Sequence, residues 1–376
     1  MRIERVLIVG LGFFLVACST DVPVEVANAL PLGLAVDAEI GTINRFAVAG
    51  CMVALYDHTN RKIHIAEDGV RRFSFGSSGT GPGEIQHVMA LALDTTGIVY
   101  AIDWGRRRLL SWTTVGKLRG DIALVHGPLS HLAVGPIAIH RDAEIVDYML
   151  GGHVSGIALS RIDLDSIPLL YLIDSSGAIT HTFGYLDMPQ DADALALRSL
   201  LQIGGLSISG DSIFVLRYQQ PRLEVYTRAH GRAPVRIMAL RRWRREAVPT
   251  ERRGTVHERG FLTGSRVQLN DAATGFGRDA AGRLYVVMLG DLEGDVRERM
   301  DSPWLTEALW VFDAEGLLLR RFLLPTRNTR GLAVASDGSV LMLSHPTAAP
   351  DASWDIVRIP PLDRQAGDGG QCRWAE

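Results

Sequence analysis

Short apolar segments separated by polar turns recur along the chain. The clearest pair is 53–63 and 99–109, which lie 46 residues apart (99 minus 53). In each copy an apolar run ends on Asp, a basic residue follows five places later, and an aliphatic residue comes next. A third copy, 214–223, keeps the final Arg-Leu but has Arg217 in place of the Asp. Short apolar runs bounded by turn residues predict β-strands.

Asp and Gly mark the turns between these segments. Turns between the first and second segment of a repeat lie at 94–97, 209–211, 279–282 and 337–338. The third segment is followed by similar turns at 174–177 and 313–316. Asp and Gly suit tight hairpins because they tolerate positive φ and bond locally to the backbone. The pattern therefore predicts antiparallel strands joined by hairpins.

Repeats of about 45 residues with four short strands are typical of β-propeller blades. We count six, with cores near 43–75, 87–124, 131–183, 201–240, 272–323 and 329–359. The sixth shows only three clear strands, and we expect residues 30–40 to supply its outer strand. The predicted fold is an all-β, six-bladed β-propeller with an N-terminal strand closing the last blade, which removes the open sheet edge.

Two motifs carry a family resemblance. Gly79-Thr80-Gly81-Pro82-Gly83-Glu84 lies between two blades, and Asp57, Asn60 and Lys62-Ile63 form a repeat motif. Together they resemble bacterial six-bladed β-propeller lipoproteins of the NHL-repeat type. The resemblance covers most of residues 30–360. The second blade departs from it, with Arg106 at the Asn place, and the fourth has lost the Asp. It implies the fold and not the function. We interpret the Asp and the basic residue as a structural contact between neighbouring strands.

The N-terminus has the order of a signal peptide: Arg2 and Arg5, an apolar run at 6–17, then Cys18. The run is too short to span a bilayer, which needs about 20 residues. Leu-Val-Ala-Cys at 15–18 resembles the bacterial lipobox, which implies cleavage after residue 17 and lipidation of Cys18. The alternative is a plain secretory signal with a chance cysteine. We predict an extracytoplasmic, lipid-anchored protein, and Ser19 favours the outer membrane over the inner.

The remaining boundaries follow from this interpretation. Residues 1–17 are the signal peptide, 18–29 a linker, 30–360 the propeller and 361–376 a C-terminal tail. The net charge of −3 argues against general nucleic-acid binding.

The other cysteines, Cys51 and Cys372, either form a disulfide or are free thiols. Pairing is plausible because Cys51 lies in a first-to-second strand hairpin, and the sixth blade should end on the same face within reach of Cys372.

Long insertions at 151–168, 184–199, 241–270 and 289–307 should share one face of the propeller, where loops usually bind ligands. Residues 191–201 within them predict a short helix. Residues 241–266 hold eight arginines against three glutamates, net +5, and 289–307 hold six acidic residues against two arginines, net −4. Either the basic segment binds an anionic ligand or acidic partner, or the two segments pair with each other.

Catalytic signatures are absent from the sequence: it has no HExxH, CxxC, Gly-x-Ser-x-Gly, phosphate loop or Rossmann fingerprint. We therefore predict no catalytic residue, metal or cofactor. His87, His131 and Arg330 lie near the starts of innermost strands, at the channel mouth, where each is either a polar cap or a ligand contact. The predicted function is a binding or scaffolding module for a protein or small molecule. The alternative is a metal-dependent hydrolase or lyase, lactonase-like or amidating-lyase-like, with its site in the central channel.

Overall fold

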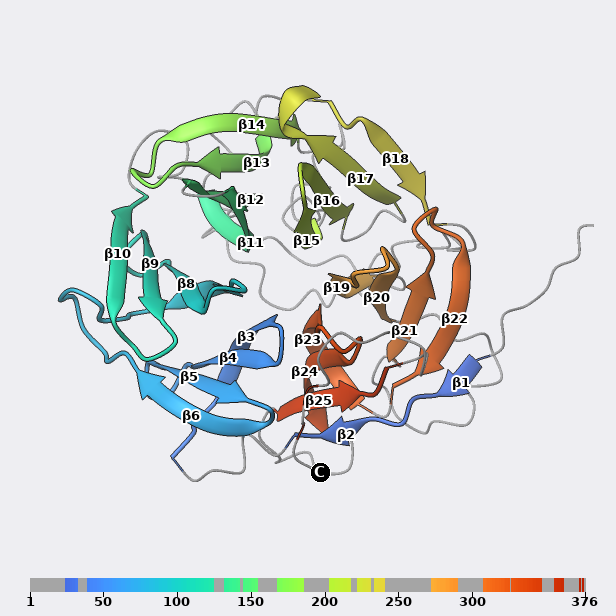
Figure 1. The fold of residues 1–376 in the computed structure, drawn as a ribbon, viewed down its shortest axis with the longest axis horizontal. Coiled ribbons are helices and arrows are strands. Elements are labelled where there is room, and N and C mark those ends of the chain that lie inside the picture. Colours follow the sequence, from blue (N-terminus) through green and yellow to red (C-terminus); the bar gives the residue numbers. More distant parts are fainter. Residues whose placement is uncertain are drawn as a thin grey trace, which may run out of the picture.

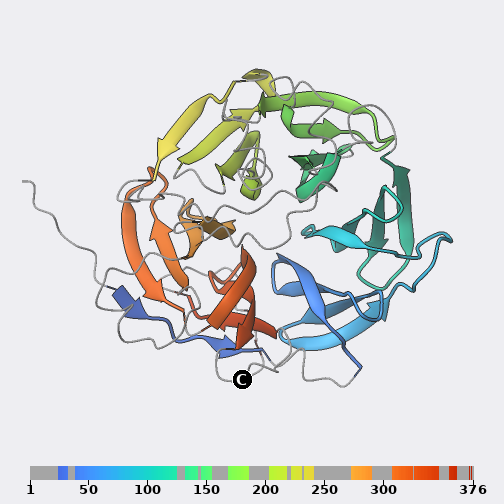
Figure 2. The same ribbon diagram turned by 180° about the vertical axis from the view of Figure 1, so that it is seen from behind.

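The described strands form a ring of six sheets around a central axis (Figures 1 and 2). The computed structural model describes residues 24–32, 39–124, 132–142, 145–154, 168–185, 203–217, 222–230, 233–240, 272–289, 307–324, 326–346 and 355–361, with Cys372 and Trp374. We number the sheets one to six in chain order of their innermost strands.

The first three sheets each contain four consecutive antiparallel strands. Sheet one contains β3 (Ile43–Ala49), β4 (Met52–Asp57), β5 (Lys62–Glu67) and β6 (Val70–Phe75). Sheet two contains β7 (Val88–Leu93), β8 (Ile98–Asp103), β9 (Arg108–Thr113) and β10 (Leu118–Ala123). Sheet three contains β11 (Leu132–Asp142), β12 (Ile145–Val154), β13 (Pro168–Ile173) and β14 (Ile179–Tyr185).

Sheets five and six each include one strand from the N-terminal segment, whereas sheet four does not. Sheet four contains β15 (Ile203–Ser209), β16 (Ser212–Arg217), β17 (Arg222–Thr227) and β18 (Arg236–Ala239), with a 3-10 turn at Arg228–His230. Sheet five contains β19 (Ala272–Arg278), β20 (Leu284–Leu289), β21 (Glu307–Phe312), β22 (Leu318–Leu323) and β1 (Val24–Val26). Sheet six contains β23 (Thr326–Val334), β24 (Val340–Pro346), β25 (Asp355–Ile359) and β2 (Leu30–Pro31).

The innermost strands β3, β7, β11, β15, β19 and β23 contact one another in turn, and β23 contacts β3. This closed order around an axis confirms the predicted β-propeller. The core lies between neighbouring sheets, where large side chains interleave. Tyr56 and Trp112 pack between sheets one and two, and Tyr171 and Tyr226 between sheets three and four. Burial of such apolar surface is the main force that holds adjacent sheets together.

The Asp-Gly hairpins form as predicted. Asp94 Oδ1 accepts hydrogen bonds from the backbone N–H groups of Thr96 (2.9 Å) and Ile98 (3.0 Å), and Gly97 has φ of 79°. Asp313 makes the same turn in sheet five, where Gly316 has φ of 83°. The Asp side chain fixes the turn from inside, and Gly supplies the left-handed backbone that closes it.

The Gly-rich segment at 79–84 forms a turn between sheets one and two. Glu84 Oε2 accepts from the backbone N–H of Gly81 at 2.5 Å. Arg106 donates from Nη1 to the carbonyl oxygens of Gly81 (3.0 Å) and Glu84 (2.7 Å). Arg106 occupies the place that Asn60 has in the first repeat, so its departure from the motif has a structural reason: it ties this turn to sheet two.

The N-terminal segment closes sheet six, as predicted, through Leu30 and Pro31. These residues pair antiparallel with Arg358 and Val357 of β25. The backbone N–H of Leu32 donates to the carbonyl oxygen of Ile356 at 2.9 Å. The outermost strand of the last sheet therefore comes from the start of the chain.

Interpretation of residues 18–29 as a linker is wrong at Val24–Val26. These residues form β1, which pairs in parallel with Arg321, Phe322 and Leu323 of β22. Two contacts hold it: Glu25 accepts from Arg320 at 2.8 and 3.1 Å, and the backbone N–H of Ala27 donates to Leu323 at 3.0 Å. The open edge of β22 offers unpaired backbone groups, and the N-terminal segment satisfies them.

Several predicted segments lie outside the described residues. These are the signal peptide with Cys18, the helix at 191–201 and most of the four long insertions, including the charged residues 241–266. Among the residues that are described, no helix is long and apolar enough to cross a bilayer.

Candidate functional site

The two faces of the ring differ in which connections they carry. We call the face with the hairpins between first and second strands, such as the β3–β4 and β7–β8 hairpins, the hairpin face. We call the opposite face, where the innermost strands begin, the insertion face. The ends of the undescribed insertions, for example residues 154 and 168 or 289 and 307, lie at the insertion face because an antiparallel strand order alternates between faces.

A cavity of about 970 Å³ lies on the ring axis. All six innermost strands line it, through their middle and C-terminal parts, together with the hairpins that follow them. It therefore lies toward the hairpin face. Its wall is apolar and polar in nearly equal parts, and Phe46, Leu91, Ile137, Phe276 and Leu332 are among the apolar lining side chains.

Charged side chains gather in the cavity where β19 turns into β20. Asp279 and Arg283 pair, with Oδ2 and Nε 2.6 Å apart. Arg278 lies beside them, and its guanidinium carbon is 4.7 Å from the ring centre of Phe214. No carboxylate in the described part of the chain pairs with Arg278. A cation beside apolar side chains, with the adjacent Asp279 already paired to Arg283, suits a ligand with an apolar body and an anionic group.

At the insertion face, His87 contacts His58 across sheets one and two. Their rings are 5.3 Å apart and nearly perpendicular. His58 follows β4 and His87 precedes β7, so the sheet ends bring them together. Arg61 donates from Nη1 to His58 Nδ1 at 2.9 Å, because a guanidinium can only donate. His58 is therefore neutral, with its proton on Nε2.

Burial and nearby positive charge act on both histidines in the same direction. Burial, reinforced by Arg61, holds the pKa of His58 below its ordinary value of 6.5. Burial, reinforced by His58 and Arg61, likewise lowers the pKa of His87. Both imidazoles are thus suited to act as neutral donors or acceptors.

The repeated Asp residues have a structural role. Asp103 accepts from the backbone N–H groups of Gln86 and His87, each at 2.8 Å. Asp57 accepts from the backbone of Gly41 at 2.7 Å and from the Asn60 side chain at 2.7 Å. Each Asp fixes the chain segment entering its own sheet, so its role is structural, but the predicted contact with the basic residue is not the one that the structure shows: Arg108 pairs with Asp121 instead. The partners are backbone groups and Asn60, whereas the basic residue at the fifth place stands opposite the Asp in the strand register.

The predicted channel-mouth residues are only partly described. His87 lies at the insertion face and is not among the cavity-lining residues. His131 lies outside the described residues. Arg330 lies in β23, where its backbone pairs with Leu343. Ligand binding at these three positions stays a prediction.

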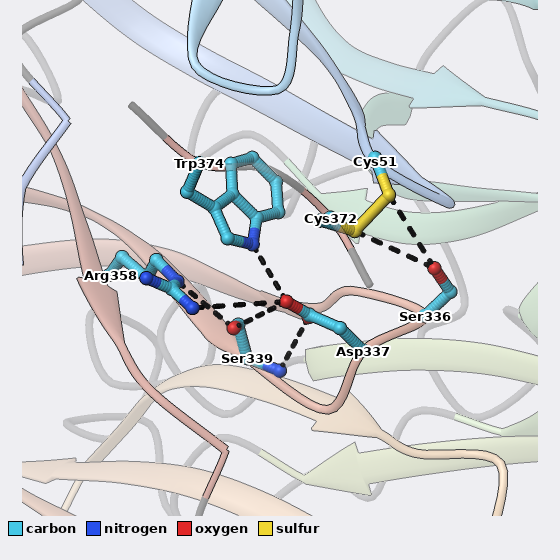
Figure 3. The surroundings of a disulfide bond; sticks show 7 residues. All are labelled: Cys51, Ser336, Asp337, Ser339, Arg358, Cys372 and Trp374. Atoms are coloured by element: carbon cyan, nitrogen blue, oxygen red, sulfur yellow. Dashed lines mark hydrogen bonds and ion pairs between the residues drawn. A yellow bond between two sulfur atoms is a disulfide. The ribbon is translucent and has the colours of Figure 1, made fainter. Parts of the chain in front are cut away.

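The cysteine pair predicted from the sequence forms a disulfide. Cys51 and Cys372 are joined, with Cα atoms 5.2 Å apart, at the hairpin face (Figure 3). Ser336 of the β23–β24 hairpin places its hydroxyl 3.9 and 3.7 Å from the two sulfurs. The bond joins sheet one to the C-terminal segment, which packs on sheet six.

Within the described ranges, no three His, Cys, Asp or Glu side chains gather in a way that could hold a metal ion. The Arg278 cluster was not predicted from the sequence. A signal for it was present: Asp94, Asp279 and Arg283 belong to hairpins that directly follow innermost strands, and those hairpins surround the channel.

No family model matches this sequence, and no curated protein matches it. Solved structures share its fold. A member of the DUF4221 family from Bacteroides vulgatus superposes with a TM-score of 0.56 at 11% identity, covering 90% of this chain and 96% of that chain. The calcium-binding protein regucalcin from Agrobacterium tumefaciens superposes with a TM-score of 0.50 at 11% identity, covering 89% and 94%. At these identities the likeness establishes a β-propeller and not an activity.

Proposed function

We propose that this protein is a lipid-anchored, extracytoplasmic β-propeller of the NHL-repeat type that acts as a binding module, with each of its six sheets forming one blade. The observation that carries the binding role is the axial cavity of about 970 Å³ lined by all six innermost strands. Its volume falls in the range typical of small-molecule sites. The apolar lipobox-like segment ending at Cys18 supports the anchor.

The chemistry of the cavity indicates the kind of ligand. The apolar side chains of the wall favour an aliphatic or aromatic body, and Arg278 offers a charge-assisted hydrogen bond to a carboxylate, sulfonate or phosphate. The Asp279–Arg283 pair keeps that part of the cavity close to neutral apart from Arg278. The favoured ligand is therefore a small amphipathic anion.

The test uses 1-anilinonaphthalene-8-sulfonate, a fluorescent anion with an apolar body, on the folded mature protein. We expect saturable binding with one site per chain. Ala333→Trp fills the cavity wall and should abolish the fluorescence gain. Arg278→Gln should weaken binding roughly tenfold, since one hydrogen bond to a charged group is lost, and Arg278→Lys should restore part of it.

The matched control is Val115→Trp, which adds the same indole at an exposed hairpin position of sheet two, outside the cavity. It should bind the probe like the parent. Circular dichroism must show that all variants are folded. Undiminished probe binding by a folded Ala333→Trp variant would overturn the cavity as the binding site.

The anchor is tested separately. Cells fed an alkyne-labelled fatty acid should label the parent protein and not the Cys18→Ser variant. Equal labelling of both would rule out lipidation at Cys18, and would leave the cavity proposal standing.

A further inference from the structure

The N-terminal strand β1 fixes where the lipid anchor must leave the propeller. Val24, its first residue, pairs with Arg321 in β22, so β1 is the outermost strand of sheet five. The bidentate contact of Glu25 with Arg320 and the buried Ala27 hold β1 in place. Figure 1 shows β1 on the outer side of β22, at the rim of the ring.

Only five residues, 19–23, separate Cys18 from Val24. Fully extended, the six Cα–Cα steps from Cys18 to Val24 span at most about 20 Å. A compact chain of this size is about 50 Å across. A lipid on Cys18 would therefore hold the rim of sheet five close to the bilayer. No such tether holds the opposite rim.

The rim beside β1 also exposes apolar side chains. Val26 is 74% exposed, and Leu317 just before β22 and Leu319 within it are 44% and 41% exposed. Placing them at the interface of a bilayer would remove apolar surface from water, which favours contact by the rim over contact by either face.

We propose that the outer rim of sheet five, formed by β1 and β22, is the surface that rests on the lipid bilayer, so that the ring stands edge-on. This inference rests on the proposed lipid anchor at Cys18. In this orientation both the hairpin face, with its axial cavity, and the insertion face stay open to the aqueous phase. A ligand can then reach the channel while the protein remains anchored.

The test attaches one fluorophore to each of four positions of the mature lipoprotein. The acylated Cys18 and the Cys51–Cys372 disulfide leave an introduced cysteine as the single free thiol. Leu319→Cys probes the rim of sheet five. Arg119→Cys is its matched control, since Arg119 has the same bulged place in β10 on the opposite rim (Figure 1). Asp211→Cys probes the hairpin face and Lys62→Cys the insertion face.

The labelled proteins are bound to vesicles of equal parts phosphatidylethanolamine and phosphatidylglycerol that carry a headgroup spin-label quencher. We expect several-fold stronger quenching at Leu319 than at Arg119, with the two face positions between them. Equal quenching at Leu319 and Arg119, or strongest quenching at either face, would overturn the edge-on orientation.

Mass spectrometry of the same samples separates the two proposals. An acylated protein with the wrong quenching order overturns only the orientation. An unacylated mature chain overturns the anchor and the orientation together. Circular dichroism on each labelled variant shows that the ring is intact.

Discussion

Arg217 and Glu224 form a buried ion pair in sheet four, with the guanidinium Nε and Nη2 atoms 3.0 and 2.9 Å from one carboxylate oxygen. Arg217 stands where the first two repeats have Asp, and it is only 3% exposed. A buried arginine needs a partner, since an unpaired buried charge is strongly unfavourable. Glu224, on the neighbouring strand β17, supplies it and also accepts from Tyr226 at 2.7 Å.

Removing one member of this pair should destabilise the fold. We expect Glu224→Ala to lower the free energy of unfolding by about 3–5 kcal/mol, because the buried Arg217 would lose the carboxylate that accepts from its Nε and Nη2. The double variant Arg217→Met with Glu224→Leu should recover part of the loss, since the buried charge is gone but the Tyr226 hydroxyl still lacks its acceptor. Urea unfolding measures both. Arg222→Ala is the control, since Arg222 is partly exposed and should cost less than about 1 kcal/mol. A double variant as unstable as Glu224→Ala would contradict this account.

Much of the ring could be predicted because its signals are local. Asp94 and Gly97 act within one turn, and the same turn recurs in other sheets, so the sequence pattern indicates each hairpin directly. Strand β1 could not be predicted in this way. It is three residues long, and its parallel pairing with β22 depends on an edge made by residues nearly three hundred positions away. Short edge pairing leaves little pattern in a sequence.

The candidate site was less predictable than the fold, for a related reason. Alternation along a strand shows which residues face a neighbouring sheet, but not how wide the space on the ring axis is. Arg278 is a candidate ligand-binding residue because it lines the cavity, lies over the ring of Phe214 and is adjacent to the Asp279–Arg283 pair. None of these relationships is visible in the sequence. His87, a candidate residue predicted from the sequence, lies instead toward the opposite end of the channel.

Two buried tyrosines on the third strands of adjacent sheets should respond oppositely to loss of the hydroxyl group. Among the described residues, the buried Tyr171 hydroxyl has no hydrogen-bond partner, and burial raises its pKa to about 12. We expect Tyr171→Phe to be neutral or to stabilise the protein by about 1 kcal/mol, since an unsatisfied polar group is removed.

Tyr226 is the matched comparison. Its hydroxyl donates to Glu224 at 2.7 Å, so Tyr226→Phe should destabilise by about 1–3 kcal/mol. Denaturant midpoints of the two variants, measured side by side, test the contrast. Equal destabilisation by both substitutions would mean that the Tyr171 hydroxyl has a partner after all.

The disulfide should stabilise the junction of sheets one and six. Cys372 and Trp374 are both buried, and Trp374 donates from Nε1 to Asp337 at 2.8 Å (Figure 3). We expect Cys51→Ser with Cys372→Ser to lower the free energy of unfolding by about 2–4 kcal/mol, since the crosslink constrains the unfolded chain. Reduction of the parent protein should give the same loss.

Trp374 separates the bond from the packing that it secures. Trp374→Ala keeps the disulfide but removes the indole from the apolar cluster and from Asp337, so it should destabilise the oxidised protein as well. Thiol counting on the denatured, unreduced mature protein should find none free. Two free thiols would show that Cys51 and Cys372 are not bonded in solution.

Stability should fall as the pH drops below neutrality, because three histidines have depressed pKa values in the folded state. Burial is the main cause for His58, His64 and His87, and Asp57 opposes it in part at His64. Below the ordinary pKa of 6.5 the unfolded chain binds protons that the folded chain does not, so unfolding is favoured progressively as the pH falls. Above 6.5 this contribution to stability is fully present. Asp57, whose pKa is lowered from 3.8, stays ionised throughout this range.

Urea unfolding at several pH values between about 8 and 5 measures the effect. The parent should lose stability steadily below pH 6.5, and His58→Gln with His87→Gln should lose less, because two of the three groups no longer titrate. The comparison must be made as a slope, since the substitutions also remove the His58–His87 contact and the bond from Arg61, which shifts stability equally at every pH. Stability that rises on acidification, or a slope that the double substitution leaves unchanged, would show that protonation of these histidines does not oppose folding.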